Sequence, residues 1–417
     1  MKVFKFGGAS VKDAQGVKRV GNILESTPGQ LIVVVSAMGK TTNALEILVP
    51  KLNDLEAEKL IKEIEDYHYS IAKDCITRRW KEQTISTLNK VFAELRETVK
   101  EYPADNYDER YDQLVSYGEF LSSRILGSYL SDEGIPNIWF NACSNIWTDN
   151  NFREARVDFT KSKKYFDQNV PIAFENANII ITEGFIGQSG SRKKTTLGRE
   201  GSDYTAAIIA HCTNAESVTI WKDVPGVMNA DPKKFEDAVK INQLSYQDAI
   251  ELAYYGASVI HPKTIKPLQN KNITLFVKSF LSPEEEGTRI DGAITKLPVP
   301  CFISKTEQVL LSLSPKDFSF IAEENLSFIF DSFAKHKVKL NMMQHSAINF
   351  SVCFDSDPRK LPGLLQSFQG NYRVLYNDNV ELFTIRYYDQ ATIDKVSKDR
   401  NILLEQRSRY TVQLVLK

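Results

Sequence analysis

Cysteine is scarce in this sequence, and long apolar runs are missing from it. The five cysteines are an odd number, lie far apart and show no zinc-motif spacing, which excludes a disulfide scaffold and a cysteine-ligated metal. No apolar run approaches the ~20 residues of a membrane span, and the amino terminus opens on a charged strand rather than on a secretion signal. We therefore expect a cytoplasmic protein with reduced thiols at Cys75, Cys143, Cys212, Cys301 and Cys353.

The sequence also lacks an excess of one charge. It carries 52 lysines and arginines against 53 aspartates and glutamates. This balance gives no electrostatic field that would steer nucleic acid or an anionic membrane to the surface. A length of 417 residues is enough for two or more domains with ample core. The composition favours a protein that acts on small molecules, without nucleic-acid or membrane partners.

A glycine turn leads into a helix-forming run at residues 195–207, with the sequence TTLGREGSDYTAA. Backbone N–H groups at a helix start attract anionic oxygens, and Arg199 adds a planar fork that matches a carboxylate or a phosphate. We expect Ser202 to be the N-cap of this helix and Asp203 to lie in its first turn. Alone, such a string is more typical of an ordinary capped helix, but a second glycine turn elsewhere favours an anion site.

That second turn follows the first predicted strand, residues 2–6, in the sequence KFGGAS at 5–10. Gly7 and Gly8 let the backbone approach a phosphate, and Lys5 supplies the positive charge that a transferring phosphoryl group needs. Neither familiar nucleotide motif is present at this end of the chain. No G-x-G-x-x-G follows the strand, and the GKT at 39–41 has Val34 where a P-loop has its leading glycine.

The pattern of apolar runs predicts an α/β fold. Short, partly β-branched runs at 31–35, 178–182, 217–221 and 273–277 alternate with helix-like segments, which is typical of a buried, largely parallel sheet. Residues 45–130 are rich in Leu, Glu, Lys and Ile, so we expect a helical subdomain there, with its last long helix at 113–130.

A polar turn at 281–287 and a stiff Leu-Pro-Val-Pro segment at 297–300 mark a domain boundary. We predict one domain over 1–290 and a second over 300–417, the latter a small α+β sandwich. Its expected strands are 309–313, 349–354, 380–388 and two within 403–416, and its expected helices are 324–336 and 361–368. Residues 389–401 have room for one short helix.

The pairing of KFGGASV at 5–11 with the 195–207 segment resembles aspartokinase, of the amino-acid kinase fold. Further matches follow in the family's order: VSA at 35–37 through Thr42 and Asn43, YGE at 117–119, TEGF at 182–185, WKDVPGV at 221–227, DP at 231–232, SY at 245–246 and GASVIHP at 256–262. The resemblance implies an α/β kinase domain followed by an α+β regulatory domain built from paired ACT modules, the second of them shortened.

The resemblance also implies roles for individual residues. Lys5 and Asp203 would be catalytic, Lys5 by stabilising the transferring phosphoryl group and Asp203 by orienting the attacking carboxylate. Arg199 would bind the substrate's α-carboxylate and Glu119 its α-ammonium, with Ser36, Thr42 and Ser202 as hydroxyl donors. ATP would contact Lys5, Gly7, Gly8, Ser10, Lys222, Asp223, Met228, Lys233 and Ser258. Mg²⁺ would bridge the phosphates, and no protein metal ligand is implied.

Some positions depart from the family's pattern. Glu200 replaces a small or neutral residue, Met228 stands where an aromatic commonly flanks the nucleotide, and Ser258 replaces a lysine. We expect these changes to raise the KM for nucleotide without abolishing the reaction. In the regulatory region, residues 321–325 have no glycine before the helix, and Asn341 stands where an aspartate often contacts the effector.

These observations predict ATP-dependent phosphorylation of the β-carboxylate of L-aspartate, the first step toward lysine, threonine and methionine, by a homodimer formed through the carboxy-terminal domain. A kinase acting on glutamate or acetylglutamate is less consistent with the combination of Glu119, the 195–207 segment and an ACT region. The other alternative is a catalytically weak amino-acid sensor on the same fold. The sequence leaves the effector and the oligomer size open.

Overall fold

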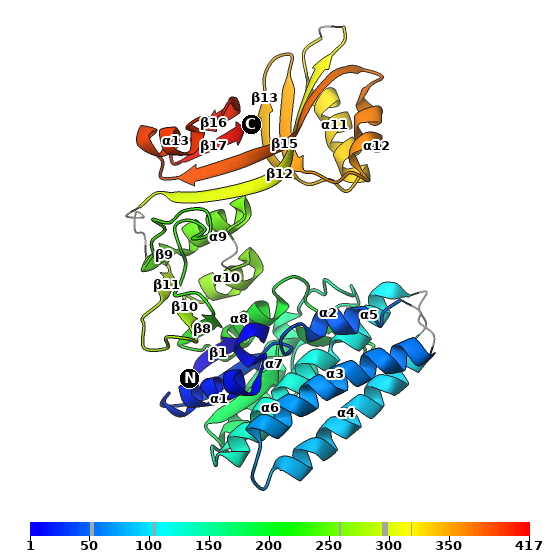
Figure 1. Ribbon diagram of the computed structural model, residues 1–417, viewed down its shortest axis with the longest axis vertical. Coiled ribbons are helices and arrows are strands. Elements are labelled where there is room, and N and C mark those ends of the chain that lie inside the picture. The colour runs from blue at the N-terminus through cyan, green and yellow to red at the C-terminus, as the bar shows by residue number, and fades with distance from the viewer. Residues whose placement is uncertain (51–53, 103–105, 258–259, 294–298, 318) are drawn as a thin grey trace. The chain divides into compact units, whose positions relative to one another are not determined.

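The computed structural model describes residues 1–50, 54–102, 106–257, 260–293, 299–317 and 319–417 (Figure 1). The chain forms two compact units, which we call the first and second units. The first contains residues 1–227, 240–250 and 259–295, and the second contains 228–239, 251–258 and 296–417. Two sequence expectations fall outside the described residues, namely the role of Ser258 and part of the boundary segment at 297–300.

The first unit is built on an eight-stranded sheet of order β3-β5-β2-β1-β8-β10-β11-β9. All neighbours pair in parallel except β10 with β11, which confirms the predicted, largely parallel sheet. Strand β2 is buried along its whole length because helices cover both faces of such a sheet. The strands are β1 (Lys2–Phe6), β2 (Leu31–Val35), β3 (Asn137–Phe140), β5 (Ile179–Glu183), β8 (Ser217–Lys222), β9 (Gln243–Ser245), β10 (Thr274–Ser279) and β11 (Thr288–Asp291).

The predicted helical subdomain is present in the first unit. It consists of α2 (Thr41–Glu46), α3 (Asp54–Cys75), α4 (Lys81–Glu101), α5 (Tyr107–Val115) and α6 (Tyr117–Asp132). The expectation of one helix over 113–130 was wrong, because α5 and α6 meet at Ser116. The Ser116 hydroxyl donates a hydrogen bond to the Gln113 carbonyl at 3.0 Å, a local bond that competes with regular helix bonding. The sheet is also covered by α1 (Ala14–Glu25), α7 (Phe159–Phe174), α8 (Gly201–Thr213) and α10 (Pro262–Gln269).

A small three-stranded sheet leads the chain into α8. It contains β4 (Trp147–Thr148), β6 (Ile186–Ser189) and β7 (Lys194–Thr196), in the order β4-β6-β7. Asp112 fixes the end of β7, since its carboxylate accepts the Thr196 N–H at 2.8 Å and the Thr196 hydroxyl at 2.7 Å. The glycine turn at 198–201 follows directly from this anchored strand.

The second unit contains a six-stranded sheet of order β13-β14-β12-β15-β17-β16. Its elements are β12 (Cys301–Pro315), α11 (Glu323–Lys335), β13 (Leu340–His345), β14 (Phe350–Asp355), α12 (Leu361–Phe368), β15 (Tyr372–Arg386), α13 (Gln390–Ser397), β16 (Ile402–Arg407) and β17 (Thr411–Leu416). The α+β class expected for this region is confirmed. The long strands β12 and β15 pair with each other from Cys301 to Pro315 of β12, so all six strands belong to one continuous sheet. Strand β13 was not predicted, because its sequence LNMMQH does not alternate.

Two segments from the middle of the sequence pack within the second unit. Ala230, Phe235 and Ala238 join the apolar cluster that also contains Phe302 and Phe383. The rings of Phe235 and Phe302 stack with their centroids 5.1 Å apart. In the segment 251–258, Glu251 forms an ion pair with the buried Arg386 of β15.

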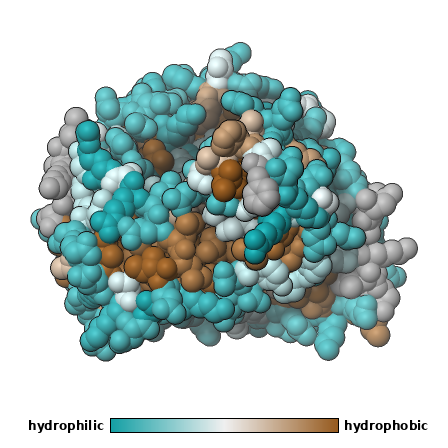
Figure 2. All heavy atoms as spheres, turned by 90° about the horizontal axis from the view of Figure 1, so that it is seen from above, coloured by the Kyte–Doolittle hydropathy of each residue, from teal (hydrophilic) through white to brown (hydrophobic). Residues whose placement is uncertain are grey.

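The surface is mixed in character. The face shown in Figure 2 is largely hydrophilic, with apolar side chains gathered near its middle. All five cysteines are free and buried. Among the described helices, none has the length and apolar character needed to span a bilayer.

Candidate active site

A cavity of about 400 Å³ lies in the first unit, beyond the carboxyl ends of β1, β2 and β8. Ligands of open α/β sheets bind at this edge, where the loops after parallel strands converge. The cavity is lined by many of the residues singled out in the sequence: Lys5, Gly7, Gly8, Ser10, Ser36, Thr42, Glu119, Ser202, Asp203, Lys222 and Asp223. The fold thus brings together residues from five separate sequence motifs.

Lys5 and Asp203 form an ion pair at the base of the cavity. The Lys5 ammonium lies 2.6 Å from Asp203 Oδ1, and the Lys222 ammonium lies 3.8 Å from Oδ2. The shorter contact has the geometry of an ion pair rather than of an aligned hydrogen bond. Lys5 and Asp203 are almost fully buried. Two cations therefore face one carboxylate, and both ammonium groups are placed where they can attract an anionic ligand.

Two glycines allow the chain to approach itself closely around the cavity. A Cβ at Gly8 would lie 2.6 Å from the Ala37 carbonyl oxygen, and a Cβ at Gly184 would lie 2.5 Å from the Ser202 side chain. Both distances are far below van der Waals contact, and the obstacle at Gly8 is rigid backbone. Any larger residue at these positions would push apart the loops that form the cavity.

The start of α8 differs from expectation. The helix begins at Gly201, and its N-cap is Glu200 in the left-handed conformation with φ 54°, so the prediction that Ser202 is the N-cap was wrong. Gly198, with φ 76°, and Glu200 together complete the turn two residues earlier. Asp203 lies in the first helical turn, as expected. Glu200 Oε2 accepts the His261 N–H at 2.9 Å, which ties this turn to the start of α10.

Glu119 presents a free oxygen to the cavity. Its Oε1 accepts the Ala37 N–H at 3.1 Å, while the buried Oε2 has no hydrogen-bond partner among the described residues. Burial raises the pKa of Glu119 to about 8, although the hydrogen bond from Ala37 and the charge of Lys5 oppose the shift. A buried acceptor of this kind is costly unless a ligand supplies a donor. Its chemistry fits an ammonium group.

Glu183 lies behind Glu119 and was given no role from the sequence. It accepts the Ala142 N–H at 2.9 Å and the Ser123 hydroxyl at 3.1 Å. Burial raises the pKa of Glu183 to about 6. These bonds fix the turn at Ala142 to the end of β5.

Arg199 lines a second cavity, of about 600 Å³, rather than the first. Thr42, Phe185 and Gly198 line both cavities, so the two are neighbours across a shared rim. Glu119 lines the first cavity and Arg199 the second, so the two predicted substrate-binding residues belong to neighbouring cavities.

Met228 and Lys233, predicted to contact the nucleotide, belong to the second unit.

The aromatic residues that line the cavity were not predicted from the sequence. Phe185, Trp221 and Phe280 line it, and Trp221 stacks on Phe6 with ring centroids 5.8 Å apart. The first two lie within recognised motifs and were open to prediction, whereas no motif contains Phe280.

Residues 1–279 match the Amino acid kinase family. The chain belongs to this family. It is 28% identical to lysine-sensitive aspartokinase 3 of Escherichia coli strain K12 over 359 residues, which cover 85% of this chain and 78% of that protein. It is 30% identical to chloroplastic aspartokinase 1 of Arabidopsis thaliana, over 86% of this chain and 64% of that protein. It also matches bifunctional aspartokinase/homoserine dehydrogenase 1 of Zea mays at 32% identity, but spans only 32% of that relative's length.

Solved structures agree with the sequence comparison. The structure of E. coli aspartokinase III with lysine and aspartate, in its T-state, superposes with a TM-score of 0.83 at 25% identity, over 100% of this chain and 95% of that one. The R-state of the same enzyme, with aspartate and ADP, gives a TM-score of 0.82 at 25% identity, over 100% and 96%. The resemblance to aspartokinases seen in the sequence is confirmed.

Proposed function

We propose that this protein is an aspartate kinase, which transfers the γ-phosphoryl group of ATP to the β-carboxylate of L-aspartate and releases ADP and 4-phospho-L-aspartate. This is the first step toward lysine, threonine and methionine. The observation that carries the proposal is that one cavity is lined by the buried Lys5–Asp203 ion pair, by Lys222 and by Glu119, one oxygen of which has no hydrogen-bond partner among the described residues. The relative in E. coli, which binds aspartate and ADP, supports it.

Aspartate lies at the rim shared by the two cavities. Ionised Glu119 accepts hydrogen bonds from the α-ammonium, and Arg199 pairs with the α-carboxylate in a planar, bidentate geometry. Ser36, Thr42 and Ser202, which line the first cavity, supply hydroxyl donors around the amino acid. These contacts hold the substrate at one end and direct its β-carboxylate toward Lys5.

In the chemical step, a β-carboxylate oxygen forms a bond to the γ-phosphorus while the bond from that phosphorus to the bridging oxygen of ADP breaks. The bonding electrons leave with ADP. The nucleophile is already ionised at neutral pH, so no general base is needed. Lys5, Lys222 and the N-terminus of α8 stabilise the charge on the transferring group, and Asp203 orients the two reactants.

The nucleotide phosphates lie over the backbone of Gly7, Gly8 and Ser10. Asp223 lines the same cavity and contacts the ribose or a metal-bound water. Roles for Met228, Lys233 and Ser258 at the nucleotide are proposed from the family resemblance alone. No cluster of three metal-type side chains occurs among the described residues, so Mg²⁺ would be held mainly by phosphate oxygens and water, with Asp203 and Asp223 as the nearest carboxylates. When bound, Mg²⁺ neutralises phosphate charge.

We also propose a kinase domain over residues 1–290, an ACT-type domain over 300–417, and a homodimer formed through the latter. Strands β13 and β16 are the two edges of the second unit's sheet, and exposed edges favour pairing across a two-fold axis. A cytoplasmic location without nucleic-acid or membrane partners is consistent with the charge balance and with the free thiols.

The test is ADP release measured with ATP, Mg²⁺ and L-aspartate, together with trapping of the acyl phosphate by hydroxylamine. We expect both signals to depend on aspartate and to be weak with L-glutamate, and the Asp203→Asn variant is the inactive control. A protein that binds amino acids but gives no aspartate-dependent ADP or hydroxamate would instead be the sensor considered above.

A further inference from the structure

Helix α3 of the helical subdomain contacts two loops that line the cavity. We call residues 7–12 the first loop and residues 36–42 the second loop. The two loops are joined directly by the Gly39 N–H, which donates to the Gly8 carbonyl at 3.1 Å. The side chain of Tyr67, on α3, also reaches both loops.

Tyr67 bonds one loop and covers the other. Its hydroxyl donates to the Lys12 carbonyl at 2.6 Å. The same oxygen lies 2.6 Å from the position that a Cβ would take at Gly39. Gly39 has φ 54°, a left-handed conformation that favours glycine, and the absence of a side chain there leaves room for the phenol. Tyr67 thus fixes the first loop by a hydrogen bond and the second by contact.

His68, the next residue, lies beneath the second loop. Its Nδ1 is 2.7 Å from the Ile64 carbonyl, and its Nε2 is 3.4 Å from the Thr41 hydroxyl. Burial lowers the pKa of His68 to about 4, so the ring is neutral at physiological pH and its Nδ1–H donates to the carbonyl. Thr41 immediately precedes Thr42, which lines the cavity.

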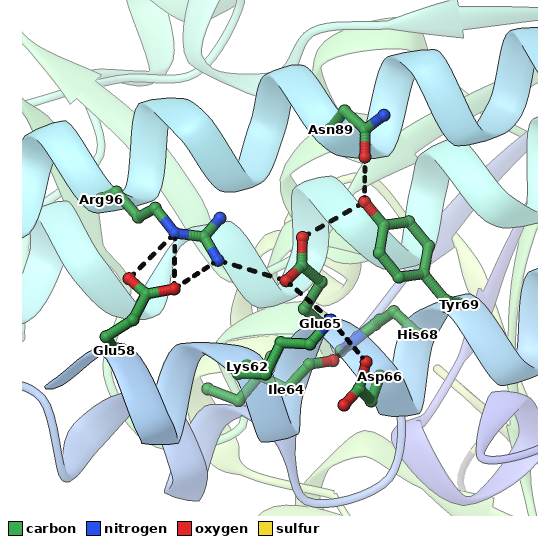
Figure 3. A network of polar contacts seen from close by, with 9 residues as sticks. All are labelled: Glu58, Lys62, Ile64, Glu65, Asp66, His68, Tyr69, Asn89 and Arg96. Atoms are coloured by element: carbon green, nitrogen blue, oxygen red, sulfur yellow. Dashed lines mark hydrogen bonds and ion pairs between the residues drawn. The ribbon is translucent and has the colours of Figure 1, made fainter. Parts of the chain in front are cut away.

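Helix α3 is itself held by an ionic network on its other side (Figure 3). Arg96 of α4 donates to Glu58 at 2.8 Å and to Glu65 at 3.1 Å, and both acceptors belong to α3. Tyr69 bonds Asn89 of α4 through its hydroxyl. Tyr69 therefore faces α4, while Tyr67, two residues earlier on the same helix, faces the site loops.

The distance between the two loops matters for the chemistry. The first loop contributes Gly7, Gly8 and Ser10 around the phosphates, and the second contributes Ser36 and Thr42 around the amino acid. A small change in the spacing of the loops would separate the attacking oxygen from the phosphorus, and misplacement by about 1 Å can cost on the order of 10²-fold in rate.

We propose that Tyr67 is a positioning residue of the kinase site, which sets the spacing of the two loops through its hydroxyl bond to Lys12 and its contact with Gly39. This rests on the proposed function. Tyr67 touches neither reactant, and it acts by holding the phosphate loop and the amino-acid loop in register. Removal of the hydroxyl alone leaves the ring in place while it removes the bond to the first loop and the closest approach to the second.

The experiment compares Tyr67→Phe with Tyr69→Phe, which removes a hydroxyl from the same helix on the side facing α4. We expect Tyr67→Phe to lower kcat about 5- to 10-fold, as the loss of one hydrogen bond predicts, with both KM values within about two-fold of wild type. Amide hydrogen exchange in peptides covering residues 7–12 and 36–42 should become faster. Tyr69→Phe should change neither kcat nor this exchange, and nucleotide-binding stoichiometry should show that all sites are intact.

Unchanged kcat in Tyr67→Phe, with or without faster exchange, would overturn the proposal. An equal loss in Tyr69→Phe would do the same, because it would assign the effect to the stability of α3. A wild-type protein without aspartate-dependent ADP release would instead refute the proposed function, and hydrogen exchange would still show whether Tyr67 holds the loops.

Discussion

The ammonium of Lys5, at the end of the first strand, lies 2.6 Å from the carboxylate of Asp203, in the first turn of α8. Each group is almost fully buried, and each is the main partner that makes burial of the other tolerable. Lys222 adds a second, more distant cation. Asp203 therefore holds both ammonium groups in place before any phosphate arrives.

Replacement of Lys5 by alanine should lower kcat far more than it raises the KM for aspartate. In the proposed mechanism its charge stabilises the phosphoryl oxygens on which negative charge develops, and the loss of such a stabiliser costs on the order of 10²-fold or more. Initial rates over a grid of ATP and aspartate concentrations measure the effect. Lys2→Ala, on the same strand, is the matched control, and near-normal turnover in Lys5→Ala would remove Lys5 from the mechanism.

Arg199→Ala should chiefly weaken aspartate binding. A charge-assisted bidentate contact acts in the ground state as well as in the transition state, so the KM for aspartate should rise about tenfold or more. The affinity for ATP should hardly change, and Arg192→Ala, in the nearby β-hairpin, should match wild type. Calorimetric titrations that show ATP weakened and aspartate spared would place Arg199 at the phosphates instead.

Aspartate capture should depend on pH through Glu119. The pKa of this residue in the free protein is about 8, and only the ionised form can pair with an ammonium. We therefore expect kcat/KM for aspartate to rise with pH through about 8 and the Glu119→Gln variant to be weak but flat over the same range. An unchanged pH profile in the variant would assign the ionisation to another group.

The same residue should affect stability in the opposite direction. Its folded pKa, about 8, lies above the ordinary value of 4.5, so its contribution to stability is fully present below about pH 4.5 and is lost as pH rises through 8. Ligand-free Glu119→Gln should therefore lose less thermal stability than wild type between pH 6 and pH 9. Melting temperatures measured across this range provide the test, and parallel curves would contradict it.

Feedback control by lysine, threonine or methionine should be weak. The Asn341 side chain already accepts from Lys305 at 2.8 Å and donates to Gln308 at 2.8 Å and to Asp355 at 2.9 Å. It carries no charge for an effector's ammonium, and effector control requires different affinities for two states. Rates at sub-saturating aspartate should change less than about two-fold with each amino acid. Strong inhibition at micromolar lysine would refute this prediction.

Sequence patterns were sufficient to predict the site residues that lie at or next to turns of the chain. Lys5 lies at the end of a strand that Gly7 and Gly8 follow, and Asp203 lies in the first turn of a helix, so local chemistry sufficed to find them. The hydrogen bonding of Glu119 could not be predicted. Its Oε1 accepts from the Ala37 N–H, far away in the sequence, and only the fold leaves Oε2 without a partner among the described residues. Phe280 was missed for the same reason: its neighbours in sequence give no signal, and its position depends on the sheet.

The helix start at Gly201 was mispredicted for a different reason. Serine is a favoured N-cap, and the sequence offered Ser202 for that role. The left-handed conformation of Glu200 was unfavourable on local grounds and exists because its carboxylate binds His261 far along the chain. Local propensity was overridden there by a tertiary contact.

The stacking of Phe235 on Phe302 has a consequence for protein engineering. In the sequence, residues 228–239 lie among the motifs of the kinase domain. In the structure, their apolar side chains form part of the hydrophobic core of the second unit. A chimera joined near residue 295 would carry a loop from one parent against a sheet from another, and a mismatch there would leave a cavity or a clash. Exchange of regulatory units between relatives should therefore succeed only when this loop is transplanted from the same donor as the sheet.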